Sequence, residues 1–396
     1  MPVPVLTLDE GMNMILTIAI AITLLTSAII VLRCCRMKLT GGDPQPLAAF
    51  MAILFTSGLD VGLIMFPLTE FPVYESQQEY GFTNALAIEF GFWGFLVWAF
   101  YFLTTFYFCV VEPKLKLFEL TPIRLANNAI IIATCAFTGF LFLSYLPDYI
   151  GGITQPLRYG LVALVVLLAV LSSTEIRYVK WLSIGSSLLF LSLIGLIWIA
   201  SGMSAGSFLE VSANLGGYFA NLPKFTSPFT DYHAFYLFWW FAWSIMIGQF
   251  VARFVGGLEV WQLLIALLTI PSILIAVWFS VLFYVHSEAI TIGVPLRLCM
   301  VAVGVVFVIN SLDSLTRLYS ENLNLTVARL GMARYVAAHW GLLFGLILLY
   351  QFTPLKIEWI GLAVIGLYAC LYALTFIHRS KFGPKPSAPI PIETPR

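Results

Sequence analysis

Residues 235–254 read FYLFWWFAWSIMIGQFVARF. A helix needs roughly 20 apolar residues to cross a bilayer, and this stretch has that length and character. Three tryptophans, Trp239, Trp240 and Trp243, fall within two turns of its middle. Tryptophan in a membrane span usually lies at the headgroup level. These three therefore indicate either a packed core or a surface that binds something.

The composition of the whole chain agrees with a membrane location. Of its 396 residues, 60% are hydrophobic and 10% are charged, whereas about a quarter of the residues in a soluble domain are charged. The net charge of zero gives no basic field for nucleic acid. None of the six cysteines has a metal-site spacing, so we expect neither a disulfide framework nor a transition-metal site.

Apolar runs of sufficient length predict about eleven transmembrane helices and an all-α integral membrane fold. The runs lie near 12–32, 47–67, 88–110, 127–146, 156–174, 181–201, 233–254, 260–284, 291–313, 335–351 and 356–377. The first run has no signal-peptide pattern and reads as a retained span. Residues 1–380 are predicted to form one transmembrane domain, and 381–396 a disordered cytoplasmic tail.

Lysine and arginine are distributed unevenly between the two sets of loops. If the first loop is cytoplasmic, 16 of the 20 basic residues fall on that side, and the exceptions are Arg158, Lys224, Arg297 and Lys356. Cytoplasmic loops carry an excess of basic residues. The pattern predicts an N-terminus outside and a C-terminus inside.

The second span contains SGLDVGLIMF, residues 57–66. Gly58 and Gly62 are four residues apart, a spacing that allows close helix packing. Asp60 lies between them, and a carboxylate near mid-bilayer costs at least about 2.5 kcal/mol. It is expected to be paired, to carry a proton or to face a cavity. Glycines beside a charge also suit the unwound helices of transporters.

The third span reads FWGFLVWAFY, residues 92–101. On a continuous helix Trp93, Trp98 and Tyr101 share one side. Together with the tryptophans of 235–254 they could form a cage, and aromatic faces attract quaternary ammonium groups. The alternative is ordinary core or lipid-facing packing, which spacing alone favours in so aromatic a chain.

The ninth span ends FVINSLDSLTR, residues 307–317. Asn310, Ser311, Asp313 and Ser314 can either bond neighbouring helices or offer oxygens to Na⁺. Thr134 and Thr138 on the fourth span are a weaker signal. The four histidines are scattered, and no metalloprotease, nucleophile-elbow or phosphate-loop motif occurs. We therefore predict that the chain is not an enzyme.

Five ordered motifs resemble the betaine/choline/carnitine transporter family. The stretch 235–254 is similar, without a gap, to the family signature FYWAWWISWAPFVGMFIAR. The others are KLTGGDPQP, SGLDVGL followed by TE, FWGFLVWAFY, and NSLDS at 310–314. The resemblance covers about residues 38 to 315 and weakens towards 377.

The resemblance implies a leucine-transporter-type fold with two inverted five-helix repeats. They would span 46–201 and 233–378, leaving one extra N-terminal helix. Family members usually have twelve spans, so this chain is identified as an atypically short member. Family members are also often homotrimers of the bacterial inner membrane.

The resemblance also implies site residues. The substrate's ammonium box would be Trp93, Trp98, Tyr101 and Trp240, with Trp243, Asp60, Gly58 and Gly62 also lining the substrate site. Phe235 and Trp239 would line the outer pathway. A sodium site would use Thr56, Leu59, Phe307, Asn310 and Ser311, with Thr138 in a second position. No cofactor is implied other than Na⁺ as coupling ion.

Asp60 and Asn310 depart from the family pattern, which has glycine and threonine there. Asp60 could pair with a cationic substrate such as choline, carry a coupling proton, or bind Na⁺ directly. We expect a secondary transporter for a quaternary-ammonium solute, with a slight preference for a cationic one, coupled to Na⁺ or H⁺. The alternative is a non-transporting receptor for the same ligands.

Overall fold

Long apolar runs form helices because a bilayer offers no water to the backbone, so each segment must satisfy its own N–H and C=O groups. The computed structural model describes residues 10–42, 50, 55 and 61–378. Within them the regular structure is helical, and the one β-type contact is an isolated bridge between Lys38 and Glu259. The predicted all-α membrane fold is confirmed.

The helices are connected by short loops and by single turns of 3₁₀ or π helix. Their bounds are α1 Glu10–Cys34, α3 Val61–Met65, α4 Pro67–Ser76, α5 Ala85–Trp93, α6 Leu96–Phe106, α7 Glu112–Leu115, α8 Thr121–Tyr149, α9 Gln155–Ser172, α10 Ile176–Ser201, α11 Ala205–Ser212, α12 Gly216–Ala220, α13 Asp231–Val251, α14 Val260–Ser287, α15 Val294–Asn322, α16 Val327–Leu330, α17 Met332–Phe352 and α18 Ile357–Ile377.

Ten helical segments among the described residues are long and apolar enough to cross a membrane. They correspond to ten of the eleven predicted spans. The remaining one, predicted at 47–67, lies largely outside the described residues, and α3 and α4 are its described continuation. The third predicted span is interrupted: α5 ends at Trp93 and α6 begins at Leu96.

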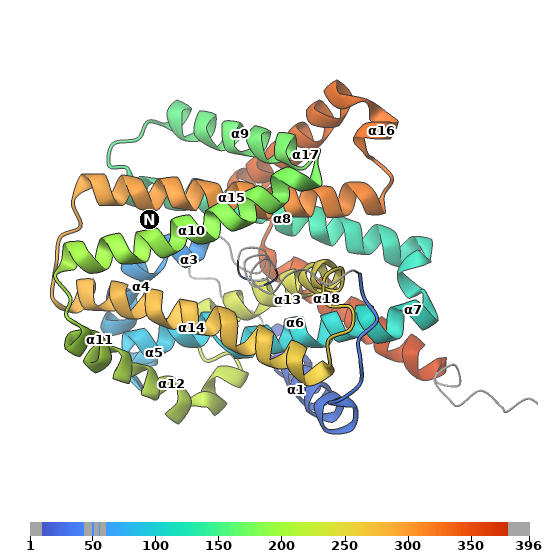
Figure 1. Cartoon of the computed structure of the whole chain (residues 1–396), viewed down its shortest axis with the longest axis horizontal. Helices are drawn as coiled ribbons and strands as arrows, with labels where there is room; N and C mark the ends of the chain where they lie inside the picture. Colours follow the sequence, from blue (N-terminus) through green and yellow to red (C-terminus); the bar gives the residue numbers. More distant parts are fainter. Residues whose placement is uncertain (1–9, 43–49, 51–54, 56–60, 379–396) are drawn as a thin grey trace, which may run out of the picture.

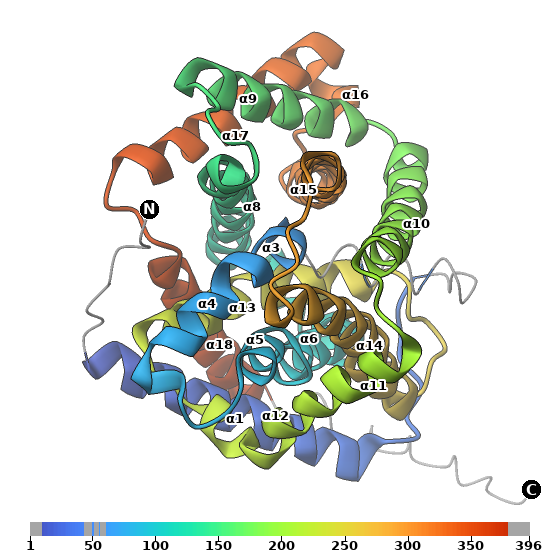
Figure 2. The same ribbon diagram turned by 90° about the vertical axis from the view of Figure 1, so that its left-hand side faces the viewer.

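The long helices run side by side in two layers (Figure 1). Helices α8, α9, α15 and α17 pack on one another and form one layer. Helices α5, α6, α13 and α14 form the other, which Figure 2 shows from one end. Helix α3 packs on α15 and α8 of the first layer, and Trp278 of α14, in the second layer, donates to the carbonyl oxygen of Leu63 on α3 at 2.7 Å.

The contacts repeat in the two halves of the chain. The third and fourth members of the first predicted group of five, α8 and α9, pack on the corresponding members of the second, α15 and α17. The first member of each group contacts the third member of the other, as α3 does with α15 and α13 with α8. This reciprocal packing is the arrangement that two related five-helix groups would adopt. The repeat boundaries themselves stay a prediction.

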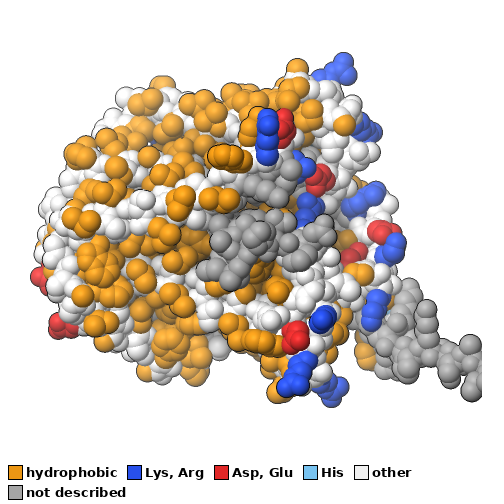
Figure 3. Space-filling model, viewed as in Figure 1, with side chains coloured by type: hydrophobic (Ala, Val, Ile, Leu, Met, Phe, Trp, Pro, Cys, Tyr) orange, Lys and Arg blue, Asp and Glu red, His pale blue; other side chains and the backbone are white. Residues whose placement is uncertain are grey.

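Charged side chains gather at one end of the molecule. Figure 3 shows lysine and arginine side chains clustered at the right-hand end, next to a broad hydrophobic surface. In Figure 1 the same end carries α7 and α16, while α4, α5 and α11 lie at the opposite end. The predicted charge asymmetry along the sequence therefore becomes an asymmetry in space.

Candidate functional site

The candidate site begins at the interruption of the third span. Gly94 and Phe95 separate α5 from α6. A Cβ added to Gly94 would approach both the carbonyl oxygen and the ring of Phe90 to 2.9 Å, closer than real Cβ contacts. The Phe95 N–H is turned away from its own helix and donates to Ser272 Oγ of α14 at 3.2 Å. Glycine and a hydroxyl partner thus allow the helix to break inside the protein.

The break leaves two backbone carbonyls without their usual helical donors, four residues further on. Tryptophan indoles take their place. Trp240 Nε1 donates to the carbonyl oxygen of Phe92 at 2.7 Å, and Trp98 Nε1 donates to that of Trp93 at 3.2 Å. Buried carbonyls are almost always paired. The first of these bonds fixes α13 directly to the end of α5.

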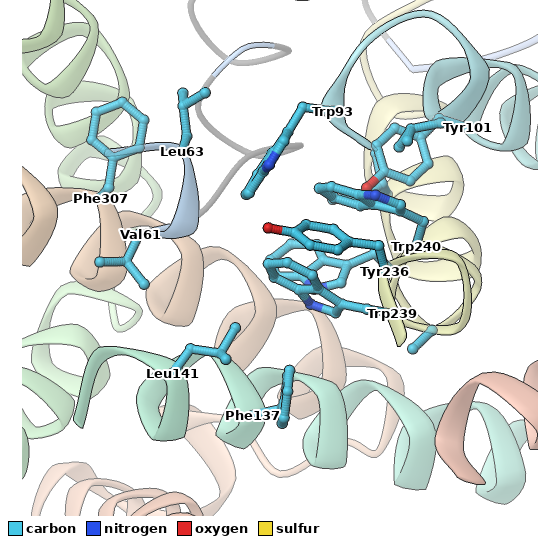
Figure 4. Packing of buried hydrophobic residues seen from close by; sticks show 14 of the residues in the cluster. Val61, Leu63, Trp93, Tyr101, Phe137, Leu141, Tyr236, Trp239, Trp240 and Phe307 are labelled. Atoms are coloured by element: carbon cyan, nitrogen blue, oxygen red, sulfur yellow. The ribbon is translucent and has the colours of Figure 1, made fainter. Parts of the chain in front are cut away.

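Three buried indoles meet at this point (Figure 4). Trp239 and Trp240 of α13 are stacked, with centroids 4.9 Å apart and planes at 13°. Trp93 of α5 stands nearly perpendicular to both, 5.0 Å from Trp240 and 5.6 Å from Trp239. Edge-to-face and offset-stacked geometries are the favoured ones for aromatic pairs.

Tyr101 and Trp98 of α6 complete a chain of contacting rings. The Tyr101 ring lies 6.5 Å from Trp240 at 77°, and the Trp98 ring lies 5.2 Å from Tyr101 at 86°. The order of contacts is therefore Trp93, Trp240, Tyr101, Trp98. The four predicted box residues are adjacent, but Trp98 reaches the group through Tyr101. Helical angles computed for an unbroken third span do not apply across Gly94.

Trp239 continues the cluster towards the start of α13. Its ring lies 5.9 Å from Phe235 and 6.1 Å from Phe137 of α8. Phe66, between α3 and α4, lies 6.1 Å from Trp93 and from Trp239. The predicted pathway residues Phe235 and Trp239 are thus joined to the box by direct ring contacts.

Trp243 occupies the next turn of α13. It is buried, and its indole nitrogen has no hydrogen-bond partner among the described residues. No ring contact of normal distance links it to another aromatic side chain of that part of the chain. It lies one turn beyond the cluster rather than within it.

The described structure places part of the predicted sodium site. Phe307 lies 6.2 Å from Phe55 and 5.8 Å from Phe190, in a separate aromatic group. Asn310 Oδ1 accepts a hydrogen bond from Ser183 of α10 at 3.0 Å, and Ser311 is buried beside it.

Several other predicted site residues cannot be placed. Thr56, Gly58, Leu59 and Asp60 lie outside the described residues, while Gly62 is buried in α3.

Polar residues near the sodium prediction also link helices. Asp313 accepts a hydrogen bond from Ser172 of α9 at 2.5 Å and another from Ser314. Thr134 and Thr138 are buried on α8, and their hydroxyls have no partner among the described residues. Asn310 and Asp313 therefore use side-chain oxygens in hydrogen bonds between helices. The hydroxyl oxygen of Thr138 is not used in this way among the described residues.

Two buried carboxyl groups lie beside the aromatic cluster, Glu70 on α4 and Glu89 on α5. The hydroxyl of Tyr145 donates to Glu70 at 3.1 Å, and that of Tyr74 donates to Glu89 at 2.7 Å. Sequence reasoning did not single out Glu89. The signal was an acidic residue inside ALAIEFGFW, one helical turn before Trp93.

The turn that connects α4 to α5 lies beside the start of α13. Tyr80 lies there, and its hydroxyl is 3.3 Å from Thr230 Oγ1 at the N-cap of α13. Burial raises the pKa of Tyr80 to about 12, so this hydroxyl stays protonated at physiological pH.

Comparison with known proteins gives a family match over part of the chain. Residues 131–286 match the model of the betaine/carnitine/choline family of transporters.

Individual relatives agree with the family match. A glycine betaine transporter of Bacillus subtilis, OpuD, is 24% identical over 62% of this chain and 57% of its own. Glycine betaine transporter 1 of Vibrio parahaemolyticus is 32% identical over 32% of this chain and 25% of its own. The chain spans about half the length of the curated relatives it matches.

Among solved structures, a Na⁺-coupled sialic acid symporter aligns with 93% of this chain and 82% of its own. The TM-score is 0.45 and the sequence identity is 15%.

Proposed function

We propose that the chain belongs to the betaine/carnitine/choline family of transporters and that it is a secondary transporter of a quaternary-ammonium solute. The names of its relatives are those of transporters, in agreement with the prediction that it is not an enzyme. The proposed location is the inner membrane of a bacterial cell, with the basic end of Figure 3 towards the cytoplasm.

One observation carries the proposal. The ring planes of Trp93 and Tyr101 both make an angle of 77° with the ring plane of Trp240, so the two rings are the walls of a partial box whose base is Trp240. Trp93 also lies 5.6 Å from Trp239, so it borders both of the stacked indoles, as Figure 4 shows. A trimethylammonium group has a diffuse charge that is cheap to desolvate, and each well-placed ring would stabilise it by about 1–2 kcal/mol. The hydrogen bond from Trp240 Nε1 to the Phe92 carbonyl holds Trp240 against the end of α5.

The proposed mechanism is alternating access. One layer, containing α5, α6, α13 and α14, would rock against the layer of α8, α9, α15 and α17. The aromatic cluster supports this reading because Trp93 and Trp240 belong to the first layer, while Phe137, which contacts Trp239, belongs to the second. Substrate bound at the cluster would therefore touch both layers.

Asp60 stays a prediction as the charge that selects the substrate. An ionised Asp60 would attract a cation such as choline and repel the carboxylate of betaine. Asp60→Gly should therefore weaken choline uptake more than betaine uptake. An equal effect on both would remove Asp60 from the substrate site. We also propose that Na⁺ binds near Asn310 and Ser311 and that the protein assembles as a homotrimer.

The experiment that tests the proposed function is an uptake assay with purified protein in proteoliposomes. Choline, betaine, carnitine and a sulfonium analogue are supplied in turn, with Na⁺ and pH gradients imposed separately. We expect accumulation of at least one solute in the vesicle lumen. Binding of these solutes without accumulation would instead indicate a receptor. Absence of both would overturn the proposal.

A further inference from the structure

Two carboxyl groups share one buried region on the side of the aromatic cluster nearest the start of α13. Glu89 is fully buried and Glu70 is 5% exposed. Tyr74, one turn after Glu70 on α4, donates to Glu89, so one tyrosine joins the turn that carries Glu70 to the second carboxyl. The two carboxyl groups come from different helices, α4 and α5, which pack directly on one another. The pair is therefore a property of the fold and not of one sequence motif.

No positive side chain in the described part of the chain forms an ion pair with Glu70 or Glu89. The ion pairs of the described residues involve other acids, and neither Glu70 nor Glu89 takes part in one. Removing an uncompensated carboxylate from water costs roughly several kcal/mol, and two adjacent like charges cost more. Buried charges without a protein partner are expected to take their positive charge from outside the protein.

The hydrogen bonds around the pair are incomplete in a specific way. Tyr74 and Tyr145 each donate to one carboxyl oxygen. The second oxygen of Glu89, Oε1, is buried without a hydrogen-bond partner among the described residues. The hydroxyl of Tyr236 on α13 is buried and equally without one.

Tyr236 lies within electrostatic range of both glutamates. Figure 4 shows its hydroxyl pointing away from the α13 axis, beneath Trp93. A spare acceptor and a spare hydroxyl therefore face the same region as the two carboxyls.

A surface cavity borders α4 beside the pair. It has a volume of about 420 Å³, and its lining includes Thr69, next to Glu70, and the exposed residue Asp148. Asp148 is within electrostatic range of Glu70. Arg297 and His286 also line it. Glu70 follows the lining residue Thr69 in the sequence, while Glu89 lies on α5, one turn before Trp93.

We propose that the buried pair Glu70 and Glu89 carries a single exchangeable proton, and that this proton is the coupling ion for the transported solute. The second half of the proposal rests on the proposed function. One proton from water adds to a glutamate oxygen, and the charge of the pair changes from −2 to −1. The proton returns to water on the other side after the layers reorient, with no other bond formed or broken.

A proton fits the site better than a metal ion. The tyrosines donate their hydrogens to the carboxyl oxygens, which a metal ion would need as ligands. The groups that face the pair are tyrosines, one aspartate and one tryptophan: Tyr74 from α4, Tyr80 from the turn after it, Tyr145, Asp148 and Tyr149 from α8, Tyr232 and Tyr236 from α13, and Trp93 from α5. Helix α14 contributes His286, whose partner is Glu75. None of the lysines or arginines is in this set.

The first test does not require transport. Infrared spectra of the purified protein are recorded across a pH series, and the C=O stretching band of a protonated carboxylic acid is followed. We expect this band to change in Glu70→Gln and in Glu89→Gln relative to the wild type, because the other buried acids, Asp313 and Glu358, are the same in all of these proteins. Glu79→Gln, an exposed acid in the turn between α4 and α5, is the matched control and should leave the band unchanged. A band identical in all four proteins would overturn the shared proton.

The second test measures coupling in proteoliposomes with a trapped pH indicator. Solute entry should acidify the lumen in the wild type and in Glu79→Gln. Glu70→Gln and Glu89→Gln should still exchange labelled solute down its gradient but should lose pH-driven accumulation by at least about tenfold. Retained proton entry in both glutamine variants would overturn the coupling role, as would accumulation that follows Na⁺ alone. Wild-type vesicles that take up none of the solutes would contradict the proposed function and, with it, the coupling half of this proposal. The infrared result would then decide the proton-holding half alone.

Discussion

Trp240 combines an aromatic face with a structural hydrogen bond. Its indole N–H satisfies the carbonyl of Phe92 at 2.7 Å, whereas the indole N–H of Trp93 has no such partner among the described residues. The two tryptophans are therefore alike as rings and different as hydrogen-bond donors. This difference could not be predicted from sequence, because it depends on where the third span breaks.

Phenylalanine in place of Trp93 or Trp240 should separate the contribution of the aromatic ring from that of the indole hydrogen bond. Trp240→Phe leaves a buried carbonyl unpaired, which costs about 1–3 kcal/mol, so its thermal midpoint in detergent should fall. Trp93→Phe removes no comparable hydrogen bond, so its thermal midpoint should fall less. The measurement is thermal unfolding of both variants beside the wild type. Equal losses would show that the Phe92 bond contributes nothing particular.

Alanine at the same positions should weaken solute binding. Loss of one wall at about 1–2 kcal/mol corresponds to roughly a 5- to 30-fold higher concentration for half-maximal uptake. Trp359→Ala is the matched control, since Trp359 is half exposed on α18, away from the cluster. Uptake assays across a solute series give the values. A Trp93→Ala protein that behaves like Trp359→Ala would exclude Trp93 from the binding site.

At the scale of helices, the apolar runs predicted ten of the described spans close to their observed positions, because length and hydropathy alone define a spanning helix. The interruption at Gly94 was not predicted. A single glycine inside an apolar run is also tolerated in unbroken membrane helices, and the Ser272 hydroxyl that supports this break is 177 residues away in sequence. Long-range partners of this kind are invisible to local patterns.

Helix α13 is held by neighbours that approach its backbone closely. A Cβ added to Gly361 of α18 would lie 2.4 Å from the carbonyl oxygen of Phe238 on α13, whereas Gly366 of the same helix faces open space. Because the obstacle is backbone, it cannot rotate aside. Gly361→Ala should lower stability by about 1–3 kcal/mol.

Gly366→Ala is the matched control for this change and should be nearly neutral. Thermal unfolding in the same detergent compares the two variants. If both alanines have the same small effect, then α18 can move away from α13, and the close approach contributes little to stability.

For the molecule as a whole, the charge pattern of the loops predicted the two ends seen in Figure 3. The prediction succeeded because it concerns only which loops share a side, and a helix of spanning length necessarily ends on the opposite side from where it starts. The sequence did not reveal that Glu70 and Glu89 meet. Their proximity arises from the packing of α4 on α5 at one end of the bundle.

Orientation can be tested with single cysteines at the two ends. Glu79→Cys lies in the turn between α4 and α5, and Arg329→Cys lies in α16 at the basic end. A membrane-impermeant maleimide added to intact cells should label the first only, and the second should react after permeabilisation. The unsubstituted protein gives the background from its six cysteines. The opposite labelling pattern would invert the proposed orientation.

The stacking of Trp239 on Trp240 has an optical consequence. Two indoles 4.9 Å apart with nearly parallel planes couple their electronic transitions. Such a pair should produce a paired positive and negative feature in the circular dichroism of the protein, sensitive to the angle between the rings. A solute that enters beside Trp240 would change that angle, so the protein carries its own spectroscopic reporter of binding.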